Sequence, residues 1–139
     1  MWQEENQRLI IDKLSEMLSA TNTTYAEKLT DMFDEARRIF ISGAGRSKLV
    51  GNFLGMRLMH CGYDVAMVGE IVTPSIKSGD LLVVISGSGE TDQLIAFTQK
   101  AKEIGAKVVL ISSRAKSTIG DLAEAVFQSK RPTLPILLK

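Results

Sequence analysis

The sequence contains little cysteine, proline and tryptophan, and it has no long apolar run. Its 139 residues include one cysteine, three prolines and one tryptophan. The lone thiol, Cys61, excludes an internal disulfide, and its neighbours provide no metal-binding spacing. We interpret Cys61 as a small buried hydrophobic residue, because no His-Asn pair accompanies it to activate a nucleophile. No apolar run approaches the roughly 20 residues that cross a bilayer, so we expect no membrane-spanning helix.

The charge of the chain is nearly balanced. Its 17 Lys and Arg residues and 16 Asp and Glu residues give a formal net charge of +1. This balance argues against nucleic acid or an anionic membrane as a partner, so any anion site must be local. Residues 1–6 are too polar and acidic for a signal peptide, and we therefore expect a cytoplasmic protein. A hydrophobic content of 45% is sufficient for one domain with one core.

Apolar residues follow first a helical and then an alternating pattern. Two amphipathic helices are expected within residues 1–37, and short apolar strands then alternate with helices. The strands are expected at Ile39–Ile41, Val65–Val68, Leu81–Ile85, Val108–Ile111 and Ala125–Phe127, and the helices at 47–60, after Thr91 and near 118–123. This order predicts an α/β fold, a doubly wound sandwich with a parallel sheet. Its ligand crevice is expected beyond the carboxyl ends of the strands.

The strand at Leu81–Ile85 runs directly into Ser86-Gly87-Ser88-Gly89-Glu90-Thr91, which we call the serine loop. Its glycines let an anion approach the backbone, and the following helix contributes unpaired N–H groups and the positive end of its dipole. The hydroxyls of Ser86, Ser88 and Thr91 add three donors. The pattern indicates a phosphate site that needs no lysine. The alternative is a Gly-Ser turn in which Ser88 or Thr91 only caps the helix.

A second glycine-rich segment, Gly43-Ala44-Gly45-Arg46-Ser47, also follows a strand and opens a helix, and we call it the glycine turn. Lys48 stands where a dinucleotide fingerprint has its third glycine, which argues against NAD. Arg46 and Ser47 instead offer a guanidinium and a hydroxyl to a phosphate or a sugar, unless Arg46 is only a solvated surface charge. Neutral donors at two strand ends, with Arg46 as the nearby cation, suit a sugar phosphate.

The helix expected at Ser47–His60 is apolar around more of its circumference than one sheet face buries. Its apolar residues are Leu49, Val50, Phe53, Leu54, Met56, Leu58 and Met59. The helix is therefore either sandwiched inside the fold or packed against another subunit. The small size of the domain favours the subunit contact, and we expect a homo-oligomer.

Four segments together carry a resemblance to a known family. They are Gly43–Ser47, Met56-Arg57-Leu58-Met59-His60, Val68-Gly69-Glu70 with Thr73-Pro74, and Gly79–Leu82 leading into the serine loop. The serine loop resembles that of the sugar isomerase (SIS) domain family, and the other segments resemble its 6-phospho-3-hexuloisomerase branch, over about residues 7–128. The resemblance implies a flavodoxin-like three-layer sandwich with a five-stranded parallel sheet and N-terminal helices packed outside it.

The same resemblance implies an activity. It is the interconversion of 3-hexulose 6-phosphate and fructose 6-phosphate through an enediol, in the ribulose monophosphate route of formaldehyde handling. Members of this branch use no metal or other cofactor and are usually tetramers. Moving a carbonyl between neighbouring carbons requires one base and donors for the developing oxyanion. The alternatives are a non-catalytic sugar-phosphate-binding module and another phosphosugar isomerase, such as arabinose 5-phosphate isomerase.

The resemblance also implies roles for single residues. The residues that would bind substrate, chiefly through its phosphate, are Ser47 and Ser86, Gly87, Ser88, Gly89, Glu90 and Thr91, with Arg46 beside them. The acid–base candidates are His60, Glu90 and, ranked third, Glu70. Each has a structural alternative: His60 as a helix end facing solvent or a neighbouring subunit, Glu90 as a first-turn carboxylate favoured by the helix dipole, and Glu70 as a loop residue.

Members of the family continue past the last strand through a segment like Gly-Thr-x-Phe-Glu and a long helix, and the glutamate there is their expected base. The present sequence does not reproduce that segment. We divide its single domain into N-terminal helices (1–37), an α/β core (38–128) and a C-terminal tail (129–139). Three accounts stay open: a shortened chain that keeps the fold and phosphate binding, a chain whose first helix supplies the missing cover, or an isomerase with Glu70, Glu90 or His60 as base.

Overall fold

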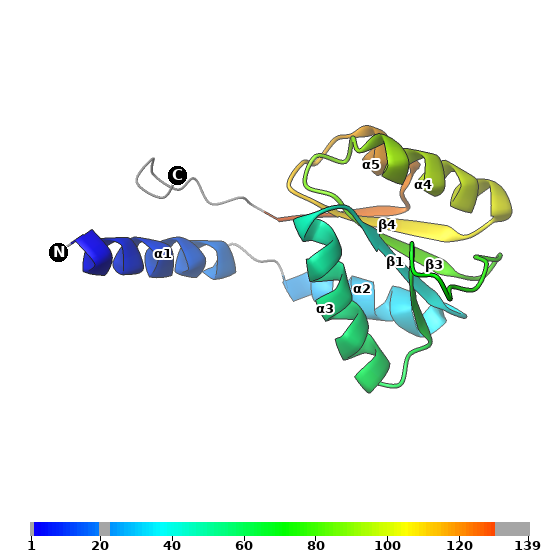
Figure 1. Cartoon of the computed structure of the whole chain (residues 1–139), viewed down its shortest axis with the longest axis horizontal. Coiled ribbons are helices and arrows are strands. Elements are labelled where there is room, and N and C mark those ends of the chain that lie inside the picture. The colour runs from blue at the N-terminus through cyan, green and yellow to red at the C-terminus, as the bar shows by residue number, and fades with distance from the viewer. Residues whose placement is uncertain (1, 20–22, 130–139) are drawn as a thin grey trace.

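The computed structural model describes residues 2–19 and 23–129, and this part of the chain forms five strands and five helices (Figure 1). The helices are α1 (Trp2–Ser19), α2 (Thr23–Glu35), α3 (Arg46–His60), α4 (Asp92–Ile104) and α5 (Thr118–Leu122), and the strands are β1 (Ile39–Gly43), β2 (Val65–Met67), β3 (Leu81–Ile85), β4 (Lys107–Ser112) and β5 (Ala125–Gln128). All five expected strands are confirmed, with ends that differ by at most two residues. The predicted tail lies outside the described residues, apart from Ser129.

The five strands form one sheet in the order β2-β1-β3-β4-β5, and every neighbouring pair is parallel. All five residues of the central strand β3 are buried, as expected for an apolar strand with helices on both faces. Gly43, the last residue of β1, pairs with Ile85, the last residue of β3. The glycine turn and the serine loop therefore leave the sheet side by side at its carboxyl edge.

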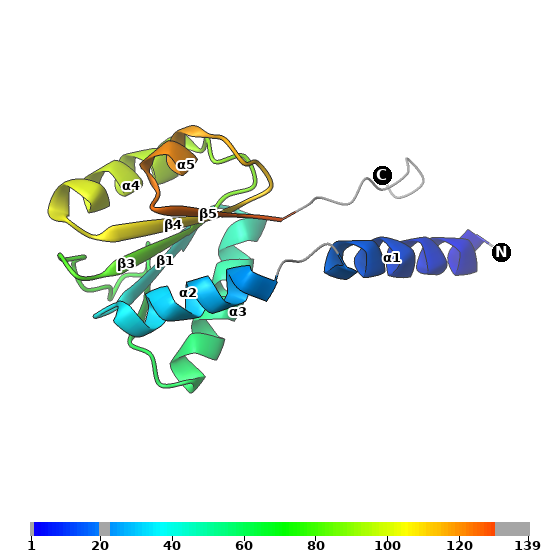
Figure 2. The same cartoon turned by 180° about the vertical axis from the view of Figure 1, so that it is seen from behind.

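The helices cover both faces of the sheet, with α4 and α5 on one face and α2 and α3 on the other (Figures 1 and 2). Each face of the sheet carries its own hydrophobic core, and alternate residues of β1 belong to opposite cores. Ile39 and Ile41 pack on the α2 and α3 side, and Phe40 packs with α4 and α5. The chain passes from β1 to α3 on one face and from β3 to α4 on the other. The carboxyl ends of β1 and β3 thus form the switch point at which ligands bind in such sheets.

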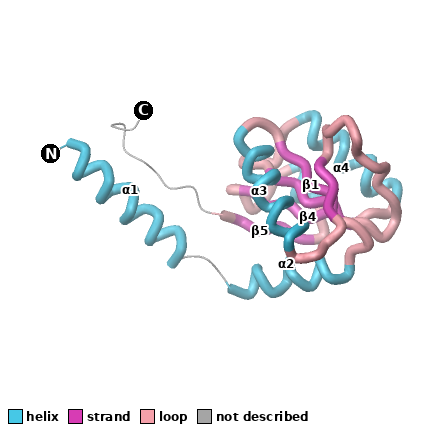
Figure 3. Tube along the Cα trace, turned by 60° about the horizontal axis from the view of Figure 1, so that its bottom comes forward, coloured by secondary structure: helices cyan, strands magenta, loops and turns pink. Residues whose placement is uncertain are grey.

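The two N-terminal helices behave differently. Helix α2 buries Phe33 against the sheet and packs Leu29 and Met32 beside it. Helix α1 stands apart from the sheet in all three views (Figures 1, 2 and 3), and the apolar side chains of Ile11 and Leu14 are exposed. Helix α1 therefore does not supply the cover for the sheet that the sequence left open as one alternative.

Helix α3 approaches the sheet closely through two glycines. A Cβ on Gly51 would lie 2.9 Å from Cγ2 of Ile41, and a Cβ on Gly55 would lie 2.9 Å from Sδ of Met67. The glycines therefore let the helix backbone sit directly on β1 and β2. Its opposite side carries large apolar residues that stay exposed, with Phe53 76% exposed. The helix is not sandwiched inside the described part of the domain.

The interpretation of Cys61 as a buried residue is wrong. Cys61 is exposed at the carboxyl end of α3, where its backbone N–H donates to the carbonyls of Arg57 and Leu58, both at 3.1 Å. Cys61 follows His60, the last residue of α3, and the buried residues of this helix end at Leu58. None of the described helices is long and apolar enough to cross a membrane.

Candidate phosphosugar site

The serine loop folds back on itself through two short hydrogen-bonded turns. The backbone N–H of Gly89 donates to Oγ of Ser86 at 3.0 Å, and that of Glu90 donates to Oγ of Ser88 at 3.1 Å. A hydroxyl that accepts keeps its own proton, so both serines still have a donor; Ser86 is buried, at 3% exposed, whereas Ser88 is half-buried. Thr91 is the N-cap residue of α4, yet its side chain makes no capping hydrogen bond. The alternative in which Ser88 or Thr91 serves only as the helix cap is therefore not observed.

The first half of the serine loop is held by the end of β4. The backbone N–H of Ser86 donates to the carbonyl of Ile111 at 3.0 Å. The carbonyl of Gly87 accepts from Oγ of Ser112 at 3.1 Å and from Oγ of Ser113 at 2.5 Å. These contacts fix the loop before any ligand arrives, which lowers the entropic cost of ordering it on binding.

The second half of the loop is held by α5. The carbonyl of Gly89 accepts from the backbone N–H of Ile119 at 3.1 Å. Gly89 has φ +67°, and a Cβ at this position would lie 2.1 Å from Oγ of Ser117, the residue that caps α5. Only glycine fits here, because any side chain would be both strained and in collision.

Glu90 binds the first residue of α5 with both carboxylate oxygens. Its Oε2 accepts from Oγ1 of Thr118 at 2.6 Å, and its Oε1 accepts from the backbone N–H of Thr118 at 2.8 Å. These two hydrogen bonds, with a smaller contribution from the positive charge of Arg114, hold the pKa of Glu90 below its ordinary value. A carboxylate with a lowered pKa is a weaker base. Its catalytic role stays a prediction, and its position in the structure is that of a residue that orients the loop.

The glycine turn lies next to the serine loop at the same edge of the sheet. Gly45, the N-cap residue of α3, has φ +59°, and a Cβ on Gly43 would lie 3.0 Å from the backbone of Ser47. The turn is therefore tight and brings the start of α3 close to the strand end. Arg46 is exposed and Ser47 is half-buried.

The other two acid–base candidates lie at opposite ends of the domain. Glu70 follows β2 at the carboxyl edge of the sheet, where its backbone carbonyl accepts from Oγ1 of Thr73 at 2.9 Å. His60 is the last residue of α3, roughly 20 Å along the helix axis from its first residue, Arg46. Helix α3 runs away from the serine loop, so His60 and the serine loop of one chain are not brought together.

A pocket of about 570 Å³ opens between the glycine turn, the end of β2 and α4. We call it the lysine pocket, because Lys48 and Lys100 line it. Its other lining residues are Ser42, Gly43, Ala44, Gly45, Val68, Gly69, Gln93, Leu94, Ala96 and Phe97. The hydroxyl-bearing residues of the serine loop do not line it, although Gln93 and Leu94 belong to the helix turn that follows the loop.

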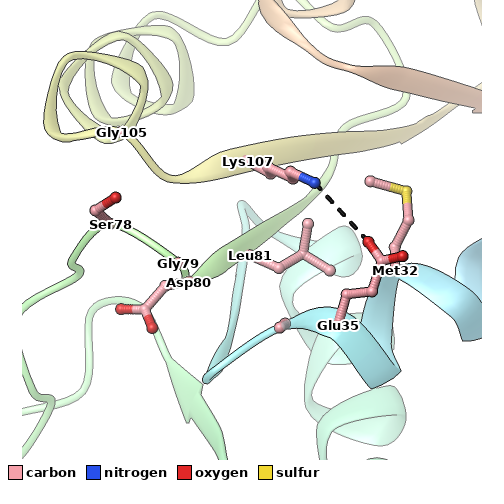
Figure 4. Close-up of a pocket in the computed structure, with 9 residues that line it drawn as sticks. Met32, Glu35, Ser78, Gly79, Asp80, Leu81, Gly105 and Lys107 are labelled. Carbon is pink, nitrogen blue, oxygen red and sulfur yellow. Dashed lines mark ion pairs between the residues drawn. The ribbon is translucent and has the colours of Figure 1, made fainter.

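A smaller pocket of about 310 Å³ lies at the opposite edge of the sheet, where β3 and β4 begin (Figure 4). Lys107 and Glu35 form an ion pair there at 3.8 Å. The buried carboxylate of Asp80 accepts from Nε of Arg37 at 3.1 Å and from the backbone N–H of Lys77 at 2.7 Å. These charged groups already have partners, and the pocket is remote from the serine loop. We assign it a structural role.

The family model for the SIS domain matches residues 32–133. The chain belongs to the SIS domain family. The 3-hexulose-6-phosphate isomerase of Methylomonas aminofaciens is 50% identical over 120 residues, which cover 86% of this chain and 66% of that protein. This SIS domain therefore spans just under two thirds of the length of that relative.

Solved structures show the same SIS fold. A Methanococcus jannaschii protein, whose crystal structure was taken to infer a 3-hexulose-6-phosphate isomerase function, matches with 34% identity and a TM-score of 0.76, over 90% of this chain and 72% of its own. The NanR protein of Vibrio vulnificus, complexed with ManNAc-6P, matches with a TM-score of 0.77 over 96% of this chain and 53% of its own. At 21% identity the second likeness shows the fold alone.

Several residues of this SIS site were not found from the sequence. Ser112, Ser113 and Thr118 hold the serine loop, and Arg114 adds a cation beside Glu90, so Arg46 is not the one nearby positive charge. The available signal was the run Ser112-Ser113-Arg114 at the end of a strand, which repeats the strand-then-serine pattern of the serine loop. Within the described residues, no cluster of three or more His, Cys, Asp or Glu side chains forms a metal site.

Proposed function

We propose that this SIS domain binds a phosphorylated ketohexose and interconverts 3-hexulose 6-phosphate and fructose 6-phosphate. The observation that carries the proposal is the serine loop, held by β4 and α5 at the switch point of the sheet and keeping hydroxyl donors for an anion. The 50% identity to an enzyme of that name from Methylomonas aminofaciens supports the choice of sugar. Because the chain spans only part of that enzyme, the activity is a proposal for this chain.

The phosphate of the substrate would accept hydrogen bonds from side-chain hydroxyls of the loop rather than from its backbone N–H groups. The backbone N–H groups of Gly89 and Glu90 already donate to serine oxygens. The hydroxyl protons of Ser86, Ser88 and Thr91 remain, and Ser47 adds another from the start of α3. Arg46 and Arg114 supply positive charge at the same edge. Hydrogen bonds from neutral donors to a dianion are charge-assisted and stronger than those between neutral groups.

The chemistry requires a proton to move between C2 and C3 of the sugar while the carbonyl moves the other way. A base takes the proton from one carbon and returns it to the other through an enediol, and donors stabilise the oxyanion that develops. Glu70 lies at the correct edge of the sheet to serve as this base. Glu90 serves the loop instead, through Thr118.

His60 would act in the site of a second copy of the chain. The face of α3 that points away from the sheet exposes Leu49, Val50, Phe53, Met56 and Met59, and Ile71 and Val72 are exposed after β2. An apolar surface of this kind is typical of a subunit contact. If two copies pair antiparallel along α3 about a twofold axis, His60 of one copy lies beside the glycine turn of the other. This arrangement would complete the site.

The remaining expectations belong to the same proposal and rest on the resemblance to the hexuloisomerases. They are a tetrameric assembly, a cytoplasmic location and a place in the ribulose monophosphate route of formaldehyde handling. The exposed face of α3 supports self-association.

The test is a coupled assay that follows formation of fructose 6-phosphate from 3-hexulose 6-phosphate, with binding of both sugars measured on the same preparation. Turnover together with binding supports the proposed isomerase. Binding without turnover favours the second candidate, a sugar-phosphate-binding module, for which the specific observations are that Thr118 holds the carboxylate of Glu90 and that His60 lies at the far end of α3 from the serine loop. Arabinose 5-phosphate assayed in parallel distinguishes the third candidate. Absence of binding to every phosphosugar contradicts all three.

A further inference from the structure

The lysine pocket carries a positive charge that no described side chain neutralises. Lys48, in the first turn of α3, and Lys100, in α4, both line it. Neither ammonium forms an ion pair with any residue that the structure describes, and none of the described residues that line the pocket is acidic. Two unpaired cations from different elements around one cavity favour a negatively charged occupant.

A buried hydroxyl that has no hydrogen-bond partner among the described residues lines the same pocket. The alternation along β1 places Ser42 on the same face as Phe40, which packs with α4. Ser42 is only 4% exposed and lines the lysine pocket, and its Oγ has no hydrogen-bond partner in the described structure. Buried polar groups in folded proteins are nearly always hydrogen-bonded. An oxygen atom of a ligand would supply the partner that Ser42 lacks.

The pocket also has the size and the walls of a small-molecule site. Its volume of about 570 Å³ falls within the range of roughly 300–1,000 Å³ that is common for ligand pockets. Val68, Leu94 and Phe97 form apolar walls, so the charge is confined to the two lysines. The occupant therefore combines an anionic group with an apolar body.

We propose that the lysine pocket binds a small organic oxyanion, a phosphate or a carboxylate on an apolar body, as a second ligand distinct from the sugar phosphate on the serine loop. Its oxyanion lies between Lys48 and Lys100 and accepts a hydrogen bond from Ser42. The site does not depend on the proposed isomerase function. The two sites adjoin at two places: the glycine turn, whose Gly43, Ala44 and Gly45 line the pocket, and the first turn of α4, where Gln93 and Leu94 line it directly after Thr91.

Inorganic pyrophosphate, titrated at constant ionic strength into the ¹⁵N-labelled full chain, tests this assignment. Amide shifts of Gly69 and Phe97 report the lysine pocket, and those of Gly87 and Gly89 report the serine loop. In the wild type we expect the amide shifts of both pairs of residues to saturate. In the double variant Lys48→Met/Lys100→Met, we expect the pyrophosphate affinity measured at Gly69 and Phe97 to be at least tenfold weaker. The matched control, Lys28→Met/Lys77→Met, removes the same charge elsewhere and is expected to leave both sets unchanged.

Two further variants keep the outcomes distinct. Ser88→Ala is expected to weaken the serine-loop response and keep that of the pocket. Ser42→Ala removes the unpartnered hydroxyl, so it is expected to keep or raise the urea midpoint of the ligand-free chain and to weaken the pocket response severalfold. The proposal is overturned if Gly69 and Phe97 show no saturable shift, if the control loses binding equally, or if Ser88→Ala abolishes both responses. It is also overturned if the lysine variant loses affinity for fructose 6-phosphate but keeps its pyrophosphate affinity at Gly69 and Phe97, because the lysines would then be part of the sugar site.

Discussion

Glu90 of the serine loop binds Thr118 of α5 with both carboxylate oxygens, at 2.6 Å to Oγ1 and 2.8 Å to the backbone N–H. The two residues are 28 positions apart, and they join the loop that follows β3 to the helix that follows β4. The two hydrogen bonds of this pair restrain the conformation of the glycine-rich serine loop. We therefore treat Glu90 as a positioning residue of the proposed phosphate site.

Substitution of Thr118 by Val removes the hydroxyl donor to Glu90 and keeps the backbone donor. We expect severalfold weaker binding of fructose 6-phosphate, because the loop is ordered less firmly before binding. Calorimetry measures the affinity. Thr30→Val is the matched control, since Oγ1 of Thr30 donates only to the carbonyl of Ala26 within α2. Equal affinity in the two variants would contradict the positioning role.

The stability of the domain is expected to fall in acid. The pKa of Glu90 is held below 4.5 by Thr118. Burial alone would raise the pKa of Glu124, but hydrogen bonds from the side chain of Lys102 and the backbone N–H of Val108 outweigh it and lower the pKa below 4.5. The unfolded chain therefore binds these protons at a higher pH than the folded chain. The stabilisation is present above about pH 4.5 and is lost as the pH falls through the lower folded values.

Urea midpoints between pH 7 and pH 3 measure this loss. Glu124→Gln is expected to show a smaller decrease than the wild type, because one of the two responsible carboxylates is gone. Glu103→Gln, on the exposed side of α4, serves as the control. An acid decrease that Glu124→Gln leaves unchanged would exclude Glu124 as a cause.

Substitution of Gly89 by Ala tests how closely the serine loop packs on α5. Both Gly89 and Gly62 have positive φ, +67° and +94°, but a Cβ at Gly62 would meet open space. We expect Gly62→Ala to cost about 1–3 kcal/mol of stability from backbone strain alone. Gly89→Ala is expected to cost a further ~1–3 kcal/mol through its collision with Ser117, and to weaken phosphosugar binding. Equal free energies of unfolding for the two variants would contradict this packing.

The exposed face of α3 provides a test of the shared site. Phe53→Glu places a charge at the centre of the apolar surface, and we expect it to shift the protein toward the monomer in analytical ultracentrifugation. The control, Lys28→Glu, changes charge on α2. If the domain is active, mixing His60→Asn with Ser88→Ala subunits is expected to raise activity at low substrate concentration above the mean of the two separate variants, because each heterodimer then contains one site with both native residues. A mixture that shows only this mean would place His60 outside the site.

The sheet was predictable because its residues repeat a simple pattern. Strands such as Leu81–Ile85 are apolar throughout since helices cover both faces, and the loops that follow them begin with glycine and serine. The same pattern identified the two loops at the carboxyl edge of the sheet, the glycine turn and the serine loop. The parallel order predicts that both loops leave the same edge of the sheet, but the register that pairs Gly43 with Ile85 comes from the structure.

The contacts that give the site its shape were not predictable in the same way. Glu90 was an acid–base candidate with a structural alternative, and its partner Thr118 was not foreseen because it lies in a helix of five residues with little periodic signal. Cys61 was interpreted as buried because no His-Asn pair accompanies it, whereas the structure leaves it exposed directly after the last residue of α3. Ser42 and the two pocket lysines come from three separate elements, and only the packing of α4 beside β1 brings them together.

Calorimetric titration of fructose 6-phosphate into the wild type, Ser88→Ala and the control Ser78→Ala tests the central claim most directly, namely that the serine loop binds the phosphate. Fructose is expected not to bind, and Ser88→Ala is expected to lose about 1–2 kcal/mol through one hydrogen bond to a charged group. That loss corresponds to a roughly 5- to 30-fold weaker affinity, with Ser78→Ala unchanged. Equal affinities for the two serine variants, or equal binding of fructose and fructose 6-phosphate, would contradict the account.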